Sequence, residues 1–199
     1  MSSTSAPFGL RPAYHPSGLD RAQALAGGIA SGYSTSDILK GAPIKYNSSA
    51  GTIANASAGA AWTGAFSGVE WTDTTGRRRV SNYWPSGTTY QTGSCIAYFY
   101  NDQNIVYEIQ TDATITQASI GNEYNFSATT GLTVTSGSNV TGLSTTCLGV
   151  STAVGNNTQG DMRVVDIAPY TDNAWGDAYV VVRVVNARSQ MFGSVTAFA

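Results

Sequence analysis

The stretch Ile96–Gln110, IAYFYNDQNIVYEIQ, carries the clearest strand signal in the chain. It contains two runs of β-branched and aromatic residues, Ile96–Tyr100 and Ile105–Ile109, of the kind that fits a pleated, half-buried strand. The four polar residues between them, Asn101–Asn104, are typical of a turn. Two strands joined by so short a loop predict an antiparallel hairpin.

The second run also predicts which of its side chains are buried. Because side chains alternate along a strand, Ile105, Tyr107 and Ile109 share one face, and we expect that face to point to the core. Glu108 lies on the opposite face. We therefore expect Glu108 to face solvent or an interface.

Further strand signals recur along the chain. Trp62–Trp71 alternates large and small residues, and its apolar face changes near Gly68, which predicts a bulge there. Met162–Ala168 and Tyr179–Asn186 form a second pair of strand signals, and the latter is apolar on both faces, as in a strand inside a sheet. The sequence shows no long helical pattern. We predict an all-β fold, a single β-sandwich or barrel-like domain of short antiparallel strands.

The N-terminal region, residues 1–32, differs from the predicted body, residues 33–199. Pro7, Pro12 and Pro16 withhold backbone donors from any central strand, so we expect an extended arm. A disordered tail is the alternative, although such tails are usually poor in aromatic residues. We expect a chain without this arm to stay folded. The residues predicted to bind a partner through the arm are Phe8, Leu10, Arg11, Tyr14 and Leu19.

The composition points to a neutral, polar surface. The chain is 42% hydrophobic and 11% charged, with a net charge of −2. A surface with so little charge associates easily, which favours a protein that works in an assembly. The charge gives no reason to expect nucleic-acid binding. No apolar run approaches the roughly 18 residues of a membrane span, and we expect no signal peptide.

The sequence offers little material for catalysis or metal binding. The single histidine, His15, lies in the arm, where a general base would be poorly positioned. Cys95 and Cys147 are far apart, and we favour two free buried thiols over a disulfide. One histidine and two distant cysteines do not make a zinc site. We predict no enzymatic activity, no cofactor and no metal.

Two further groups of side chains are candidates for binding. Arg77, Arg78 and Arg79 form the one charge cluster, and they either pair with carboxylates of a partner or lie in a solvated loop. Trp84 and Trp175 could stack on sugars, although core burial explains most aromatic residues in a β protein.

Several segments together resemble small structural proteins of tailed bacteriophages, which are considered capsid decoration or cement proteins. The resemblance covers most of the chain but includes no catalytic signature. It is carried by APFGLRPAYHPSG at 6–18, GYSTSDILKGAPIK at 32–45, GAFSGVEWTD at 64–73, AYFYNDQNIVYEIQTDATI at 97–115, GLSTT at 142–146 and VVVRVVN at 180–186.

The resemblance implies a non-enzymatic protein made in the bacterial cytoplasm and placed on the outer surface of the capsid. Its partner would be the major capsid protein, which it would bind between capsomers, holding the shell against the pressure of packaged DNA. Self-association as a trimer, or else a dimer, is implied as well. One alternative is a tail or head-fibre component that binds host glycans through Trp84 and Trp175. Another is a hydrolase that uses Glu70 or Glu108.

Overall fold

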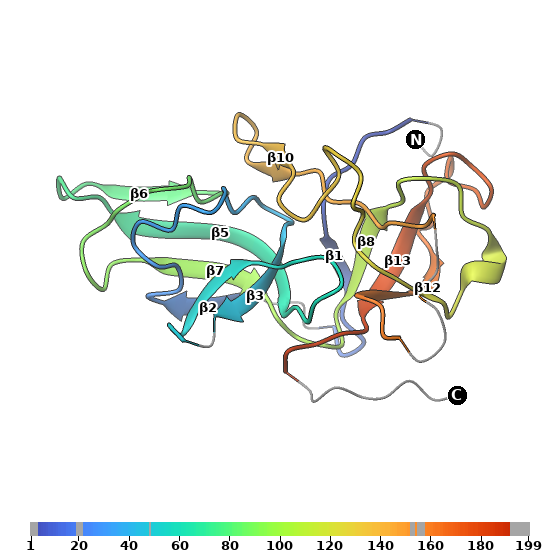
Figure 1. Cartoon of the computed structure of the whole chain (residues 1–199), viewed down its shortest axis with the longest axis horizontal. Coiled ribbons are helices and arrows are strands. Elements are labelled where there is room, and N and C mark those ends of the chain that lie inside the picture. Colours follow the sequence, from blue (N-terminus) through green and yellow to red (C-terminus); the bar gives the residue numbers. More distant parts are fainter. Residues whose placement is uncertain (1–3, 19–21, 48, 152–153, 155–157, 192–199) are drawn as a thin grey trace.

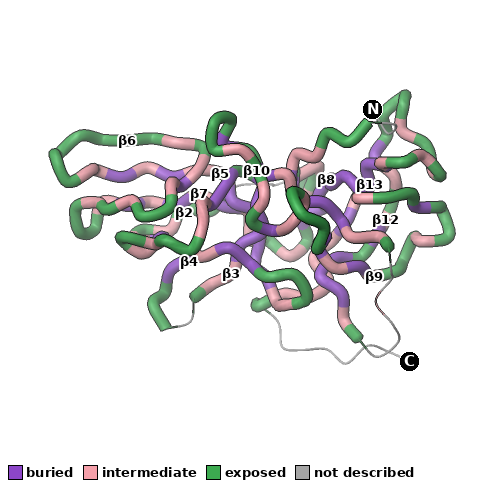
Figure 2. The backbone as a smooth tube through the Cα atoms, turned by 45° about the horizontal axis from the view of Figure 1, so that its top comes forward, coloured by how far each residue is buried: buried purple, intermediate pink, exposed green. Residues whose placement is uncertain are grey.

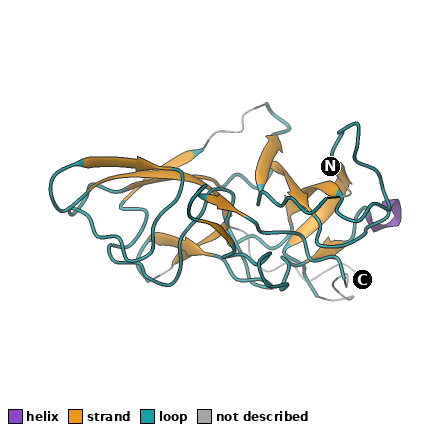
Figure 3. Cartoon of the chain, turned by 90° about the horizontal axis from the view of Figure 1, so that it is seen from above, coloured by secondary structure: helices purple, strands orange, loops and turns teal. Residues whose placement is uncertain are grey.

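The computed structural model describes residues 4–18, 22–47, 49–151, 154 and 158–191. The fold is all-β, as predicted, with antiparallel sheets packed together in a sandwich-like domain. Within the described residues the helical structure is limited to one 3-10 turn, η1 (Gln117–Ser119), visible in Figure 3. The two main sheets follow one another along the long axis of the molecule (Figure 1).

One main sheet has five strands. In spatial order they are β1 (Arg11–Tyr14), β8 (Val106–Gln110), β13 (Val181–Asn186), β12 (Met162–Ile167) and β9 (Glu123–Tyr124).

The other main sheet has six strands, and a two-stranded ribbon lies apart from both. Five strands of the six-stranded sheet follow one another in the spatial order β2 (Gln23–Ala26), β7 (Ile96–Tyr100), β5 (Gly64–Thr72), β3 (Pro43–Asn47) and β4 (Thr52–Asn55). The sixth, β6 (Arg78–Ser81), pairs with the far end of β5. The ribbon consists of β10 (Gly137–Ser138) and β11 (Leu143–Ser144).

The hairpin predicted over Ile96–Gln110 is wrong, although both of its strands exist. β7 pairs with β2 and β5 in the six-stranded sheet, whereas β8 pairs with β1 and β13 in the five-stranded sheet. The polar link between the two strands therefore passes from one sheet to the other. Each of the two strands pairs with two strands of its own sheet and not with the strand next to it in sequence. Both are therefore interior strands.

Two other predictions are confirmed. β12 and β13 pair antiparallel, and β13 lies inside its sheet between β12 and β8. The ladder between β5 and β7 is irregular between Phe66 and Gly68, where a bulge was expected. Because the bulge switches the faces of β5, Phe66, Val69 and Trp71 all point into the same core.

Each main sheet has its own apolar core, and the two cores adjoin at the start of β5. The strands that line these cores are the buried parts of the chain in Figure 2, whereas β6 is largely exposed. Gly64 makes the junction possible, because a β-carbon at this position would come within 1.6 Å of the Tyr100 carbonyl oxygen. Trp62, just before β5, is fully buried in the core of the five-stranded sheet.

Asp161 fixes Trp62 at this junction. The indole N–H of Trp62 donates to the Asp161 carbonyl at 2.9 Å. The Asp161 carboxylate accepts the backbone N–H groups of Gly59 at 2.8 Å and Phe126 at 3.0 Å. Burial raises the pKa of this carboxyl, although the same two N–H groups and the nearby Arg188 oppose the rise. Asp161, directly before β12, thus links the loop before β5 to the segment that follows β9.

The region predicted as an arm contributes a strand to each main sheet. β1 is the edge strand beside β8, and β2 is the edge strand beside β7. Leu10 and Ile29 are buried, one in each core. We therefore revise the expectation that a chain without residues 1–32 stays folded, because the deletion removes two strands and part of both cores.

Replacing Leu10 tests this assignment. Leu10 is 2% exposed, so Leu10→Ala is expected to lower the free energy of unfolding by about 2–5 kcal/mol, measured by urea unfolding. Val140→Ala is the control, because Val140 is 92% exposed and its loss is expected to cost less than about 0.5 kcal/mol. Equal stabilities of the two variants would show that the N-terminal segment is not part of the folded body.

Candidate partner-binding site

The N-terminal segment lies along β8 at the open edge of the five-stranded sheet. β1 pairs antiparallel with β8, with Arg11 opposite Glu108. The irregularity between Pro12 and Tyr14 leaves only a short regular ladder. Pro12 is compatible with this place because an edge strand does not use all its backbone donors. Side chains must therefore contribute to holding the segment in place.

Glu108 is the centre of those side-chain contacts. It is buried, and one carboxylate oxygen accepts hydrogen bonds from Arg11 Nη2 at 2.6 Å and from the Tyr170 hydroxyl at 2.5 Å. Arg11 Nη2 also donates to the Tyr170 hydroxyl. Arg183 Nε on β13 lies 3.6 Å from the other oxygen of Glu108. The expectation that Glu108 faces solvent is wrong, because β1 and the loop after β12 cover it.

These contacts determine the ionisation of Glu108 and Tyr170. Burial by itself opposes the charged form of Glu108, but the hydrogen bonds from Tyr170 and Arg11 and the charge of Arg183 outweigh it, so the pKa of Glu108 is lowered. Burial and the neighbouring Glu108 carboxylate raise the pKa of Tyr170. Glu108 is therefore a carboxylate at neutral pH, and Tyr170 is a neutral hydrogen-bond donor.

Gln110, two residues further along β8, holds the start of the N-terminal segment. Its side-chain oxygen accepts the backbone N–H of Ala6 at 2.9 Å. Its side-chain nitrogen donates to the carbonyl oxygens of Thr4 at 3.1 Å and Tyr179 at 3.3 Å. A buried amide side chain thus continues the edge of the sheet beyond the backbone ladder of β1.

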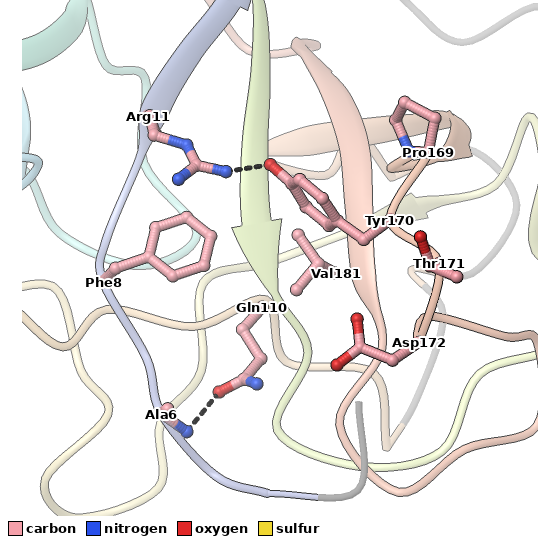
Figure 4. Close-up of a pocket in the computed structure, with 9 residues that line it drawn as sticks. All are labelled: Ala6, Phe8, Arg11, Gln110, Pro169, Tyr170, Thr171, Asp172 and Val181. Atoms are coloured by element: carbon pink, nitrogen blue, oxygen red, sulfur yellow. Dashed lines mark hydrogen bonds between the residues drawn. The ribbon is translucent and has the colours of Figure 1, made fainter. Parts of the chain in front are cut away.

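A surface cavity of about 420 Å³ opens between the N-terminal segment and the loop that follows β12. Figure 4 shows the rings of Phe8 and Tyr170 on its two sides and Val181 between them. The residues that line it are Ala6, Phe8, Arg11, Gln110, Pro169, Tyr170, Thr171, Asp172 and Val181.

Cation–π contacts connect the arginines of the site to its aromatic rings. The Arg11 guanidinium carbon lies 4.8 Å from the centre of the Phe8 ring and 5.7 Å from that of the Tyr170 ring. The guanidinium carbon of Arg183 lies 5.3 Å from the centre of the Tyr14 ring. Such contacts contribute about 0.5–1 kcal/mol each at exposed sites, and they restrict where the guanidinium groups point.

The structure brings together most of the arm residues predicted to bind a partner. Phe8 and Arg11 line the cavity, Tyr14 packs on Arg183, and Leu10 is buried in the core beneath them. Leu19 lies outside the described residues. The site thus forms within one chain; partner binding by these residues stays a prediction.

The arginine cluster is remote from this site, at the end of the six-stranded sheet. Arg78 pairs with Glu70, and Arg79 Nε lies 3.0 Å from Asp73. Hydrogen bonds from Thr75 and from the backbone of Arg77 hold the pKa of Asp73 well below its usual range. All three arginines remain exposed on β6 and the turn before it, but two of them already have carboxylate partners in their own chain.

The structure separates Glu70 and Glu108, the two glutamates considered for hydrolysis, from each other and from Glu123, the third glutamate of the chain. Glu70 is in the six-stranded sheet, whereas Glu108 and Glu123 lie on β8 and β9, with β13 and β12 between them. Three strand spacings of about 4.8 Å place the latter two far beyond the separation of about 5–10 Å that paired glycosidase carboxylates use.

His15 makes a local turn and reaches the link between β7 and β8. Its Nδ1 accepts the backbone N–H of Ser17 at 3.0 Å and lies 2.6 Å from the Ser17 hydroxyl. Its Nε2 lies 3.2 Å from Asp102 Oδ2. Since Nδ1 already accepts a backbone donor two residues away, this Ser–His–Asp arrangement acts as a turn cap that attaches the N-terminal segment to the link.

The cysteines are free and buried, as predicted. Burial raises the pKa of both thiols, that of Cys147 to about 12, so neither is poised as a nucleophile. Among the described residues, no three histidine, cysteine, aspartate or glutamate side chains gather in a way that suits a metal ion. The same part of the chain has no helix with the length and apolar character needed to span a membrane.

Sequence reasoning missed half of the site. Tyr170 and Arg183 were not singled out, and Gln110 was noted only for its position in a strand. Glu108 was placed on the correct face of its strand, opposite Ile105, Tyr107 and Ile109, but its burial was not predicted. A charged or amide residue within an otherwise apolar strand run was the available signal, because such a group needs a buried partner if the strand is interior.

Comparison with known proteins found no relative of this chain. The chain matches no family model, no curated protein and no solved structure.

Neutralising Glu108 tests the network. Because the pKa of Glu108 is lower in the folded chain than its ordinary value of 4.5, the carboxylate stabilises the fold at neutral pH, and this contribution disappears as the pH falls through the folded pKa. Glu108→Gln is expected to cost about 1–3 kcal/mol of unfolding free energy at pH 7, and the difference from wild type should shrink towards pH 3.

Urea unfolding of both proteins at several pH values measures this difference. Asp166→Asn, which alters an exposed carboxylate on β12, is the matched control and should change stability by less than about 0.5 kcal/mol. A Glu108→Gln penalty that is absent at pH 7, or that has the same size at pH 3, would contradict the proposed role of the charge.

Proposed function

We propose that this chain is a non-enzymatic structural protein of a tailed-phage virion, a decoration or cement protein. It binds the major capsid protein on the outer surface of the shell, between capsomers, and stabilises the shell against internal DNA pressure. The observation that supports the proposal most is that residues 6–18, the first segment of the family resemblance, include β1 and supply Ala6, Phe8 and Arg11 to the surface cavity.

The way the chain distributes its charge supports this role. Four arginines with largely exposed side chains are paired with carboxylates of the same chain: Arg11 with Glu108, Arg78 with Glu70, Arg79 with Asp73 and Arg163 with Glu123. A surface neutralised in this way suits binding through apolar and short-range polar contacts. Such contacts are individually modest, but a symmetric shell multiplies them over many copies of the protein.

The strand edges that stay open among the described residues support the role as well. β1 ends the five-stranded sheet, and β6 is exposed beside β5. A neighbouring chain can add a strand to such an edge. Self-association about a symmetry axis, as a trimer or else a dimer, is part of the proposal.

The burial of Trp84 weakens the glycan-binding alternative. Trp84 is fully buried and packs edge-to-face against Trp71 with ring centres 5.2 Å apart, so it does not offer a face to a sugar. Trp175 is partly buried against the core of the five-stranded sheet. A tail or head-fibre component that binds glycans through both tryptophans therefore has only one of them near the surface.

Electron cryo-microscopy of purified virions of a phage that encodes this chain tests the proposal. We expect hundreds of copies on the outer shell, at positions between capsomers, with the cavity side or a strand edge against the capsid protein. Urea or heat treatment of shells with and without the protein should then show earlier opening of the undecorated shells.

Two results would overturn the proposal. A few copies confined to the tail or fibres would favour the adhesion alternative, which a glycan array with wild type and Trp175→Ala would then test. Absence of the chain from purified virions would exclude both virion roles.

A further inference from the structure

The cavity between the N-terminal segment and the loop after β12 has mainly apolar walls. Figure 4 shows the rings of Phe8 and Tyr170 facing the space from opposite sides, with Val181 between them and Pro169 at the rim. Its volume of about 420 Å³ lies within the range of about 300–1,000 Å³ that is usual for ligand pockets. A bulky apolar side chain fits such a space.

Most polar groups at the cavity are already occupied by the protein. The Gln110 amide binds backbone groups through both its oxygen and its nitrogen. The Tyr170 hydroxyl donates to Glu108, and Glu108 in turn is shared with Arg11. These groups shape the cavity and offer little to a ligand.

Arg11 differs from the other polar groups at the cavity because part of its side chain has no partner among the residues that the structure describes. Its side chain is 51% exposed, and its contacts with Glu108 and Tyr170 both use Nη2. Within the described part of the chain, Nε and Nη1 donate to no protein acceptor. A guanidinium group has five N–H donors in a fixed plane, so an edge of this one is free to bind an oxyanion.

The charges around Arg11 favour an anion there. Two guanidinium groups, those of Arg11 and Arg183, surround the single carboxylate of Glu108. Phe8 and Tyr170 lie beside the Arg11 guanidinium and restrict where it points. A ligand carboxylate is therefore directed to Arg11.

We propose that this cavity binds a segment of a partner protein that presents a bulky apolar side chain next to a carboxylate. The side chain enters between Phe8 and Tyr170, and the carboxylate pairs with the free edge of Arg11. The assignment of this segment to the capsid protein rests on the proposed function. The type of side chain that the cavity binds is inferred from the cavity residues alone.

N-acetyl-L-phenylalanine, which combines an aromatic side chain with a carboxylate, is a minimal probe. Added to the ¹⁵N-labelled full chain, it should cause saturable shifts of backbone amides in residues 6–11 and 169–172. N-acetyl-L-phenylalaninamide lacks the carboxylate and loses the charge-assisted hydrogen bonds. Its affinity should therefore be at least about tenfold lower. Sodium acetate alone should cause no saturable shift.

Filling the cavity gives a variant that leaves the fold intact. Thr171 lines the cavity from an exposed loop, so Thr171→Phe blocks the space without altering a core. Thr92→Phe makes the same change in an exposed loop next to the six-stranded sheet and is the matched control. Thr171→Phe should abolish probe binding, and Thr92→Phe should preserve it. Arg11→Lys keeps the charge but loses the planar fork, and should weaken the acid while leaving the amide unchanged.

Three results would overturn the cavity proposal: no saturable shift with the acid, equal binding of the acid and the amide, or undiminished binding to Thr171→Phe. Decoration of shells that lack the protein provides the separate test of the partner. Loss of decoration with Thr171→Phe but not with Thr92→Phe supports a capsid segment in the cavity. Normal decoration by a Thr171→Phe variant that no longer binds the probe overturns that assignment, while the cavity chemistry stands.

Discussion

A buried carboxylate on an interior strand is the constraint on which the candidate site depends. β8 has neighbours on both sides, so Glu108 must find its counter-charges inside the protein. They come from β1 and β13, as Arg11 and Arg183, and Tyr170 in the loop after β12 adds a neutral hydrogen-bond donor. These three segments are far apart in sequence, and Glu108 is where they meet. The cavity exists because Arg11 and Tyr170 are held on this one carboxylate, one on each side.

Sequence patterns predicted the strands well and their partners poorly. The periodicity of side chains in β7 and β8 shows that each is a strand, but it does not say which strand lies alongside. A short polar link usually makes a hairpin. Here both strands are more fully paired in separate sheets, where β7 gains β2 and β5, and β8 gains β1 and β13. The bulge near Gly68 was predictable because it changes which face is apolar, and a change of that kind is visible in sequence.

The candidate site was predictable only on one side. Phe8, Leu10 and Arg11 attracted attention because apolar and charged residues in a proline-rich segment need a surface to pack on. That surface is made of Glu108, Tyr170 and Arg183, whose meeting depends on the strand order β1-β8-β13-β12. Strand order is a long-range property that no local pattern records. The burial of Glu108 was missed for the same reason. Side-chain alternation predicts that Glu108 points away from the core beside β8, but it does not show whether another part of the chain covers that face.

Pairing charges within the chain has a consequence for how this protein meets others. Arginines that already hold a carboxylate contribute little attraction at long range, and salt screens what remains over about 8–10 Å. A partner must then be recognised at contact, by shape, apolar side chains and the few hydrogen-bond donors that the fold leaves free. Arg11 is such a donor, because its Nη2 holds Glu108, its Nε and Nη1 have no acceptor among the described residues, and its side chain lines the cavity. The same side chain therefore holds the N-terminal segment on its own sheet and offers that segment to a neighbour.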